Sequence, residues 1–574
     1  MTYQSFPIAD YKSGVFTAKE PWLAPNDAFE VMINASVKRG RIRKRKGSTL
    51  VGYTPCRINV TLTWADDGGD NVEVTTSGAH GLSDGDYIII QGVTGTGNSL
   101  VNDKRFFVDV TAATTFNLQN MTWSGNFDGT TAGGTVDQVK AISKDATAAN
   151  ADVTGISKAC PAVVTTSSAH GLSTGNVVQI VEEENDALTG MTEVLNVVSP
   201  ITVISTTTFE LDNVESTNYG TYSSGGTVAL VDEDADPVVG MFQFRKQDGT
   251  FMLLVATTTR LSKFTGDKAN LEALSTSDDY SGGATDYFSF SALGDKAYLT
   301  NNNDVPDETD GSSAPTTHSF DATGVTKAKF FFPFKDRLMV LNTVEGGTNF
   351  PQRMRWSDIL STPTSNPDWD AGGALDASTD QAIVGYEFLK DTVIVFFDES
   401  VWAIKDTGNK DIPFRWELID NLSILTDAPF SVIGHKNWVW AFGSGGWVRT
   451  DGHRVEDFDD PIPNFAEGLD GTDRAILYSH RNFAERQIWH AYPAADEDNT
   501  GASASRNNEV LVYNFESPSF SRYDYNYQVG SEFNKSLDGK TWADITSSWP
   551  AINISWSDFR VQTPLPELDR KSVV

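Results

Sequence analysis

The chain has 574 residues, of which 39% are hydrophobic and 11% aromatic, and its formal net charge is −33. This length gives room for roughly two to four domains with substantial cores, and the composition excludes a wholly disordered protein. So acidic a surface repels phosphate and disfavours a protein that binds nucleic acid tightly, although DNA could pass it without adhering. Ordinary solubility is the other explanation of the charge.

Neither a membrane segment nor a disulfide framework is predicted. No run of 18 apolar residues occurs, and the first seven residues have neither the basic start nor the apolar core of a signal peptide. We therefore expect synthesis in a reducing cytosol and no membrane span. The two cysteines, Cys56 and Cys160, are too few for a metal site by themselves. We expect both to be small packed residues, and a bridge between them is left open.

An N-terminal arm is predicted over residues 1–56. Asp27 stands three residues before Glu30, as a helix-capping residue would, and predicts a short helix through Ala35. A basic strip follows, in a chain that otherwise carries −40; its seven cations are Lys38, Arg39, Arg41, Arg43, Lys44, Arg45 and Lys46. The strip is either a hairpin edge whose charges prevent aggregation or a docking surface for an acidic partner. That partner is a neighbouring copy of the chain or DNA phosphate.

Two tandem repeats come next. Residues 74–86 recur at 164–176, an offset of 90, with the shared core Ala-His-Gly-Leu-Ser. Both copies continue with an apolar strand, a Thr-rich stretch and Gly-Gly-Thr-Val. This order predicts two small β-barrel or sandwich domains, at 57–142 and 143–232.

The repeated histidines, His80 and His170, invite a metal-binding interpretation. A turn is the simpler one, in which Gly81 and Gly171 take the φ that the chain needs and each imidazole hydrogen-bonds its loop. We therefore predict structural turns and no metal site.

The rest of the chain, 233–574, is predicted to be a β-propeller. Six times a charged, amide or Gly turn runs straight into an apolar strand, at intervals of 41 to 55 residues, which is close to one four-stranded blade. The turns lie at Asp248, Asp295, Asp336, Asp391, Lys436 and Glu485. The fold class predicted for the whole chain is thus all-β, a propeller with two small β-domains inserted near the N-terminus.

Motifs spread over the chain resemble a known family. In the N-terminal arm these are Gly14, Trp22, Pro25, Asn34-Ala35, Gly40, Arg45 and Gly47, followed by Ser48-Thr49-Leu50. This order resembles the N-terminal signature of tail nozzle proteins (tail tubular protein B-like) of short-tailed bacteriophages, with Lys46 where a proline is more usual. Residues 355–358 ahead of Pro367-Asp368-Trp369 resemble a recurring blade motif of such propellers, and 555–558 resemble a second copy.

The resemblance implies a structural virion protein of the phage tail, assembled in the host cytoplasm. It implies a ring of six copies, docked to a tail adaptor ring and to fibres, around a channel through which the genome leaves. Six copies would carry roughly −200, so that DNA passes without specific binding. The basic strip would be the inter-subunit or adaptor contact, and residues 49–53 would supply a closing strand to the propeller. A polar loop at Asn499, Thr500, Gly501, Ala502 and Ser503 would form a gate.

A β-propeller is compatible with two other functions. A propeller glycosidase would need two fixed carboxylates, and no Gly-x-Ser-x-Gly, His-Glu-x-x-His or phosphate loop occurs, so we predict no catalytic site and no cofactor. A receptor-binding module would read sugars with exposed aromatics, of which Trp438, Trp440 and Trp447 are the densest group. Their alternation also suits a blade core, which we favour.

Overall fold

The fold is all-β in the residues that the computed structural model describes. These are 13–18, 25, 27–29, 31–38, 41–45, 54–58, 60–143, 152–182, 187–195, 197–212, 214–231, 237–265, 271–276, 278–360, 367–410, 412–421, 428–443, 446–458, 462, 474–494, 506–516, 518–533 and 567–569. Within them strands predominate, with a single α-helix, α1 (Asn98–Val101), and short 3-10 turns. No helix of these residues is long and apolar enough to cross a membrane.

Six groups of four antiparallel strands follow one another between residues 238 and 524, each group in sequence order across its own sheet, and the sixth sheet also includes two N-terminal strands described below. In chain order they are β18 (Val238–Arg245), β19 (Phe251–Thr257), β20 (Leu261–Phe264) and β21 (Glu272–Ala273); β22 (Ser289–Leu293), β23 (Lys296–Thr300), β24 (Asp307–Thr309) and β25 (Thr316–Thr317); β26 (Val325–Phe334), β27 (Arg337–Glu345), β28 (Thr348–Trp356) and β29 (Gly373–Asp376); β30 (Ile383–Leu389), β31 (Thr392–Phe397), β32 (Val401–Asp406) and β33 (Phe414–Asp420); β34 (Ile433–His435), β35 (Trp438–Phe442), β36 (Trp447–Thr450) and β37 (Val455–Asp457); β38 (Tyr478–Asn482), β39 (Gln487–Tyr492), β40 (Glu509–Asn514) and β41 (Ser519–Asp524). We call them the six-sheet body.

The apolar strand of each predicted sequence module is present as the second strand of a sheet. The turn before it contains a residue at positive φ in every sheet: Gly249 (90°), Gly294 (61°), Asp336 (58°), Lys390 (57°), Lys436 (56°) and Arg486 (59°). A tight hairpin turn needs positive φ so that its twist matches that of the flanking strands. The charged and Gly residues of the repeat are therefore hairpin turns between first and second strands.

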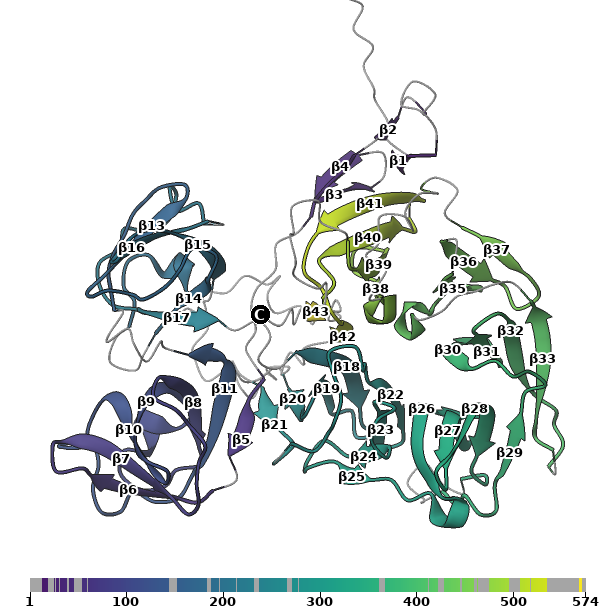
Figure 1. Cartoon of the computed structure of the whole chain (residues 1–574), viewed down its shortest axis with the longest axis horizontal. Coiled ribbons are helices and arrows are strands. Elements are labelled where there is room, and N and C mark those ends of the chain that lie inside the picture. Colours follow the sequence, from purple (N-terminus) through teal and green to yellow (C-terminus); the bar gives the residue numbers. More distant parts are fainter. Residues whose placement is uncertain are drawn as a thin grey trace, which may run out of the picture.

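The six sheets stand side by side around a common centre (Figure 1). Aromatic rings on or just before the first strands of five of them contact one another: Tyr287, two residues before β22, lies 5.4 Å from Phe430, in the 3-10 turn before β34, and 5.9 Å from Tyr478 on β38, centroid to centroid. Phe330 lies 5.0 Å from Tyr386 and 6.4 Å from Phe430. Edge-to-face packing of this kind stabilises a core beyond the area it buries. Aromatic contacts thus join five of the six sheets at or next to their first strands.

Residues 62–231 form two modules with one strand order. The first module runs β6-β7-β10-β9-β8-β11 across its sheet and the second β12-β13-β16-β15-β14-β17. The strands are β6 (Leu62–Asp66), β7 (Asn71–Thr76), β8 (Asp86–Gln91), β9 (Lys104–Ala112), β10 (Thr115–Thr122), β11 (Thr135–Ser143), β12 (Val153–Ile156), β13 (Ala162–Thr166), β14 (Val177–Val181), β15 (Val198–Ser205), β16 (Thr208–Leu211) and β17 (Thr227–Val231). The repeated sequence therefore encodes a repeated topology.

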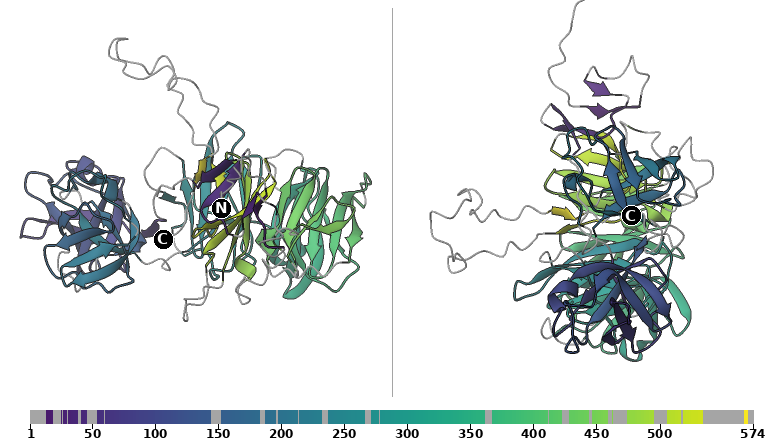
Figure 2. Two further views of the ribbon diagram at one scale, coloured as in Figure 1. Left: turned by 90° about the horizontal axis from the view of Figure 1, so that it is seen from above. Right: turned by 90° about the vertical axis from the view of Figure 1, so that its left-hand side faces the viewer.

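The two modules are fused through their last strands. β11 pairs antiparallel with β17, with Ile142 opposite Val231. Tyr87, Phe107 and Val181 are among the buried residues of an apolar cluster that spans the seam. Figure 2 shows the module pair and the six-sheet body as two lobes.

The predicted N-terminal helix is wrong. Ala28 and Phe29 form strand β2 (Ala28–Phe29), and Ala35 begins strand β3 (Ala35–Lys38). The Asp27 carboxylate accepts a hydrogen bond from the Ser13 hydroxyl at 2.9 Å instead of capping a helix. Asn34 has a φ of 55°, which a continuing helix does not allow.

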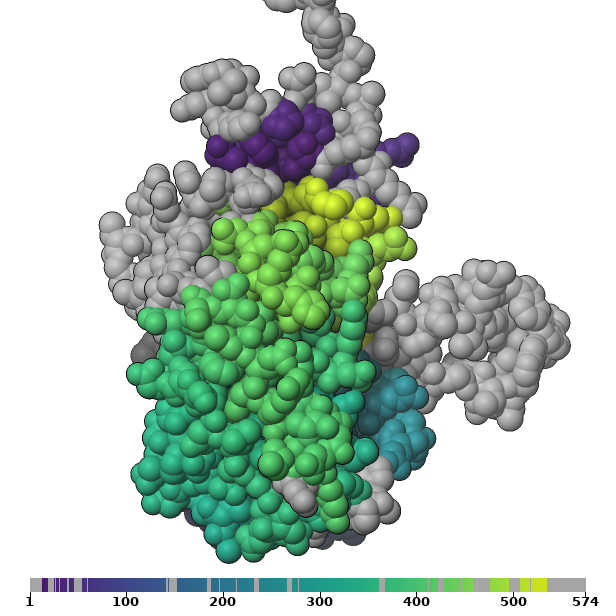
Figure 3. Space-filling model, turned by 90° about the vertical axis from the view of Figure 1, so that its right-hand side faces the viewer, coloured from purple at the N-terminus to yellow at the C-terminus, as the bar shows by residue number. Residues whose placement is uncertain are grey.

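The N-terminal residues extend the sixth sheet. Strand β1 (Gly14–Val15) lies parallel to β41, with Gly14 opposite Phe520, and β2 lies parallel to β1. Figure 3 shows this purple segment on top of the yellow strands of the sixth sheet. The segment 49–53, expected to supply a closing strand, lies outside the described residues.

Replacing Gly14 by alanine is expected to detach β1 from β41. Gly14 has a φ of +64°, and a Cβ there would lie 2.5 Å from the Phe520 carbonyl oxygen, which is backbone and cannot turn aside. Hydrogen exchange of the Phe16 amide, which donates to the Phe29 carbonyl, measures the loss. Gly408→Ala is the matched control, because its φ of +70° imposes the same strain in open space. Equal protection of Phe16 in both variants would contradict the expectation.

The cysteines lie in different environments. Cys56 is buried at the start of β5 (Cys56–Ile58), whereas Cys160 is exposed. No disulfide therefore joins these two described residues. The expectation that both are packed is correct for Cys56 and wrong for Cys160, which lies in a bend before β13.

Candidate docking surface

The basic strip is a hairpin, formed by β3 and β4 (Arg41–Lys44), with Val37 opposite Ile42. It is fixed to the sixth sheet. The side chain of Val37 is fully buried, and its carbonyl oxygen accepts a hydrogen bond from the Asn514 amide. Gln487 Nε2 also donates to Ser36 Oγ at 3.2 Å. These contacts anchor the hairpin to the sixth sheet.

Of the five predicted cations that lie in the described part of the chain, Lys38 and Arg45 make contacts within it. Lys38 Nζ lies 3.3 Å from a carboxylate oxygen of Glu485. Arg45 lies over the Tyr525 ring, with its Cζ 4.3 Å from the centroid, and its Nε donates to Asn34 Oδ1 at 3.2 Å. Cation–π contacts and partly shielded ion pairs of this kind hold the hairpin in place.

Three cations form the outer surface of the hairpin: Arg41, Arg43 and Lys44 are exposed. Arg39 and Lys46 lie outside the described residues. The structure thus divides the predicted strip into cations that fasten the hairpin and cations that face outward.

The N-terminal segment also has exposed apolar side chains, which the sequence interpretation missed. Val31 is 65% exposed, and Ile33 and Ile42 are each 44% exposed. The available signal was the position of Ile42 between two arginines, where a strand alternates its faces. Because the faces alternate, Ile42 points away from the side of the hairpin that carries Arg41 and Arg43.

The predicted gate loop, Asn499 to Ser503, lies outside the described residues, so the structure does not place it. The structure does describe the three tryptophans, Trp438, Trp440 and Trp447. Trp440 and Trp447 are 3% and 1% exposed and form part of the core, as predicted. Trp438 is half-buried, and the Arg449 guanidinium covers its ring at 4.4 Å. These rings are thus occupied by the protein itself rather than offered to a sugar.

The repeated histidines are structural turns, as predicted. His80 Nδ1 accepts the Leu82 amide hydrogen at 3.0 Å and its Nε2 lies 3.0 Å from the Ala112 carbonyl oxygen. His170 makes the same contacts at 3.1 Å with Leu172 and 2.9 Å with Ser205. Since Nδ1 accepts, the proton of each neutral ring is on Nε2. Gly81 and Gly171 have φ values of 68° and 66°. In the described residues no cluster of His, Cys, Asp or Glu has the arrangement of a metal site.

Two buried histidines make stability depend on pH. Burial lowers the pKa of His480 and of His490 to about 3. Below pH 6.5 the unfolded chain protonates these side chains, whereas the folded chain does not until about pH 3. Their contribution to stability is complete above pH 6.5 and is lost as the pH falls. We expect the free energy of unfolding to fall by about 1.4 kcal/mol per pH unit for each, between pH 6 and 4.

Guanidinium unfolding at unit pH steps measures this slope. His490→Gln is expected to reduce it, because one of the two proton uptakes is removed. The Ser479 hydroxyl, 2.7 Å from His490 Nδ1, would then face the glutamine amide. An unchanged slope in that variant would contradict the assignment.

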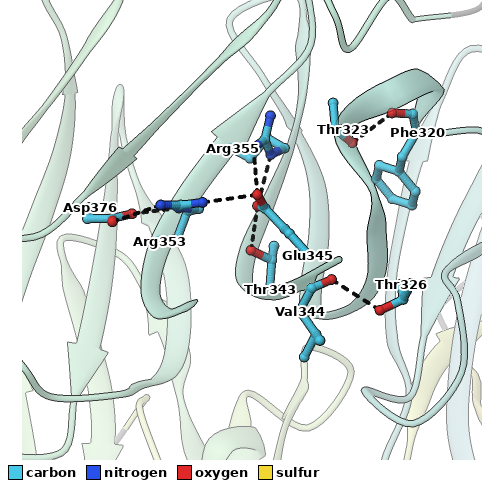
Figure 4. A network of polar contacts seen from close by, with 9 residues as sticks. All are labelled: Phe320, Thr323, Thr326, Thr343, Val344, Glu345, Arg353, Arg355 and Asp376. Atoms are coloured by element: carbon cyan, nitrogen blue, oxygen red, sulfur yellow. Dashed lines mark hydrogen bonds and ion pairs between the residues drawn. The ribbon is translucent and has the colours of Figure 1, made fainter. Parts of the chain in front are cut away.

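A charge network pins the third sheet (Figure 4). Glu345 accepts hydrogen bonds from Arg355 Nη2 at 2.6 Å, Arg353 Nη1 at 3.0 Å and Thr343 Oγ1 at 2.8 Å. Arg353 also binds Asp376 through two N–H groups, at 2.7 and 3.0 Å. Burial alone would raise the pKa of Glu345, but these donors outweigh it and hold the pKa below its ordinary value. Two cations balance two carboxylates, so the network ties β27, β28 and β29 together.

A second polar cluster joins the module pair to the six-sheet body. Arg57 Nε and Nη2 donate to the buried Asp137 carboxylate at 2.9 and 3.3 Å, and this hydrogen bonding raises the pKa of Arg57. Arg260, on the body, donates to the Arg57 carbonyl oxygen at 3.0 Å and pairs with Asp278 at 2.7 Å. The apolar clusters of the modules are separate from those of the body in the described residues. The described junction is therefore polar.

Comparison with family models gives a local match. Residues 159–232, the second module, match the family described as Ubiquitin-activating enzyme E1 FCCH domain. No curated protein matches the chain. A chain of the solved structure titled "Crystal Structure of Mitotic Checkpoint Complex" aligns with 52% of this chain and 81% of its own length, at 11% identity and a TM-score of 0.30. A likeness with that TM-score carries no argument about function.

Proposed function

We propose that this chain is a structural virion protein, one copy in the nozzle ring of a short phage tail. In this proposal the six-sheet body is a six-bladed β-propeller. Six copies form a ring that docks to a tail adaptor ring and carries fibres. The genome leaves through the channel of the ring, and neither catalysis nor a cofactor is involved.

The observation that carries the proposal is the way the N-terminal residues join the sixth sheet. Gly14 pairs with Phe520, so residues from both ends of the chain build one sheet. The modules at 62–231 are consequently an insertion in the body rather than a leading domain. An N-terminal segment, inserted small β-domains and a propeller are the order that the family resemblance implies.

The aromatic centre bears on where a channel would run. Rings on or just before the first strands of five sheets contact one another, among them Phe430, Tyr287 and Tyr478. We place the channel between copies for this reason, and not through one propeller. At −33 per copy its walls would repel DNA phosphate and favour sliding over adhesion.

The family match on residues 159–232 adds support for the modules alone. It covers one of the two repeats and gives no reason to propose a ubiquitin-related role. The modules would project from the ring as separate lobes, where they could meet fibres or the adaptor. The proposal includes a gate formed by residues 499–503. A variant that lacks residues 499–505 and still retains DNA would contradict the gate.

Negative-stain electron microscopy with native mass at several concentrations tests the proposal. Rings of six copies with a hole wide enough for a DNA duplex are expected. The measurement is repeated with the adaptor ring, because the nozzle ring could close only on that support. A chain that stays monomeric under both conditions would contradict the proposal and make a glycan-binding screen the next experiment.

A further inference from the structure

The junction between the module pair and the six-sheet body differs from the interior of either lobe. In the described residues, no strand of the modules pairs with a strand of the body, because β5 to β17 form one sheet and the body strands form others. Within the same residues, no buried apolar cluster contains side chains from both lobes. The contact described across the junction is polar and lies where β5 approaches β21 (Figure 1).

Arg260 is at the centre of this contact. It lies in the turn between β19 and β20, where its amide donates to the Thr257 hydroxyl at 3.1 Å and its carbonyl oxygen accepts from the Thr257 amide at 2.8 Å. The Arg260 side chain is 11% exposed and pairs with Asp278 at 2.7 Å, also on the body. Its Nη1 donates to the carbonyl oxygen of Arg57 on β5 at 3.0 Å. A guanidinium fixed by the body therefore holds the backbone of a module strand.

Charges on the two sides of the junction reinforce this hydrogen bond. Burial would raise the pKa of Asp278, but the guanidinium beside it and, at longer range, Lys140 on β11 hold that pKa below its ordinary value. The pKa of Arg57 is raised, chiefly by its hydrogen bond to Asp137 and further by the charge of Glu272 on β21. Lys140 and Arg57 are module cations, whereas Asp278 and Glu272 are body anions. Both attractions therefore draw the lobes together.

We propose that this junction is a clasp, and that the module pair swings on the body as one unit when the clasp opens. Interfaces between domains permit relative motion unless they are large and apolar, and the described junction is polar. The module pair stays intact during the motion, because β11 pairs with β17 and a buried apolar cluster spans that seam. Opening breaks the Arg260 hydrogen bond, which water can replace, and two attractions, which salt screens.

The clasp does not depend on the proposed function, because all of its groups lie within one copy of the chain. It goes beyond that function by giving the modules two states, docked on the body and released from it. Neither state requires a lobe to unfold. In a ring, release would change the directions in which the modules project.

Double electron–electron resonance between two nitroxide labels tests the inference. One label is attached to native Cys160, which is exposed in the second module, and the other to the variant Lys410→Cys, at an exposed position of the body. Cys56 is buried, and mass spectrometry checks that each chain carries two labels. Dilution with unlabelled chain restricts the measurement to distances within one copy. The native chain at low salt is expected to give one narrow distribution, the docked distance.

Salt and substitution are expected to open the clasp to different extents. At about 1 M salt, where the Debye length is about 3 Å, the share of other distances is expected to rise about threefold. Arg260→Met is expected to raise that share about tenfold at low salt, because a charge-assisted hydrogen bond is lost. Lys140→Gln keeps this hydrogen bond and is expected to reduce the response to salt.

Lys296→Met is the matched control. It breaks an ion pair of 2.6 Å with Glu308 inside the body and is expected to leave the docked distance unchanged. Circular dichroism and melting temperature check that each variant folds. If Arg260→Met does not fold, Asp278→Asn replaces it, because Asp278 is 56% exposed and its loss frees the Arg260 side chain. A rise of about threefold in the other distances is expected for that variant.

Two results would overturn the clasp. One is a narrow docked distance that Arg260→Met, or Asp278→Asn in its place, leaves unchanged at low and high salt. The other is a native chain with broadly spread distances at low salt, because the lobes would then move without any clasp to open. Native mass of the same samples records ring formation separately, so the failure of the nozzle proposal and the failure of the clasp are distinguishable.

Discussion

Replacing Arg57 by methionine is expected to destabilise the first module by about 3 to 5 kcal/mol. The Asp137 side chain on β11 is only 2% exposed and accepts both hydrogen bonds of the Arg57 guanidinium. Without the guanidinium, a carboxylate is left buried and uncompensated. Hydrogen exchange of the amides that pair β11 with β8 measures the free energy of opening in this module.

A double variant distinguishes the buried charge from lost packing. Arg57→Met with Asp137→Leu removes both charges and is expected to recover most of the loss. Arg454→Met is the exposed control, since its pair with Glu456 lies at the surface and contributes at most about 1 kcal/mol. If the single and double variants lose the same stability, the buried-charge explanation fails.

Replacing Trp369 by alanine is expected to destabilise the body by about 3 to 5 kcal/mol. The side chain is 1% exposed and packs on Phe320 with centroids 4.8 Å apart. Its Nε1 donates to His318 Nε2 at 3.0 Å, which leaves the imidazole proton on Nδ1, where it points to Glu308 at 2.7 Å. Chemical denaturation followed by fluorescence gives the change.

Trp369→Phe isolates the hydrogen bond from the lost volume. It keeps a ring but leaves the buried His318 acceptor unsatisfied, so a loss of about 1 to 3 kcal/mol is expected. Trp416→Phe is the matched control, because that indole donates to the Leu375 carbonyl at 3.2 Å in an exposed setting. Equal losses in the two variants would contradict a role for burial.

Features that depend on residues close together in the sequence were predicted correctly more often than features that depend on distant residues. Hairpin turns at Asp336 or Lys390 depend on residues that accept positive φ, directly before an apolar strand, and both requirements can be read within ten residues. The turns at His80 and His170 could be predicted for the same reason. The helix predicted at Asp27 is wrong although its signal was local: Asp27 binds Ser13 from outside the segment, and Ala28 and Phe29 pair with β1 as a strand.

Pairing between strands far apart in the chain could not be predicted from the sequence. No pattern near Gly14 indicates that Phe520, some 500 residues away, is its strand partner. The same limit applied to the docking surface. Counting cations located the strip, but which of them face outward depends on Glu485 and Tyr525, which only the fold brings to the hairpin.

The pairing of β11 with β17 has a consequence for how the modules arose. These are equivalent last strands of two copies of one unit, joined antiparallel through Ile142 and Val231. A single unit would leave this part of the edge unpaired, and a second copy of the unit covers it through the symmetric antiparallel pairing seen here. The two modules pair as the subunits of a homodimer would, although they belong to one chain. Covalent linkage makes its assembly independent of protein concentration, so duplication converted a bimolecular equilibrium into a folding step.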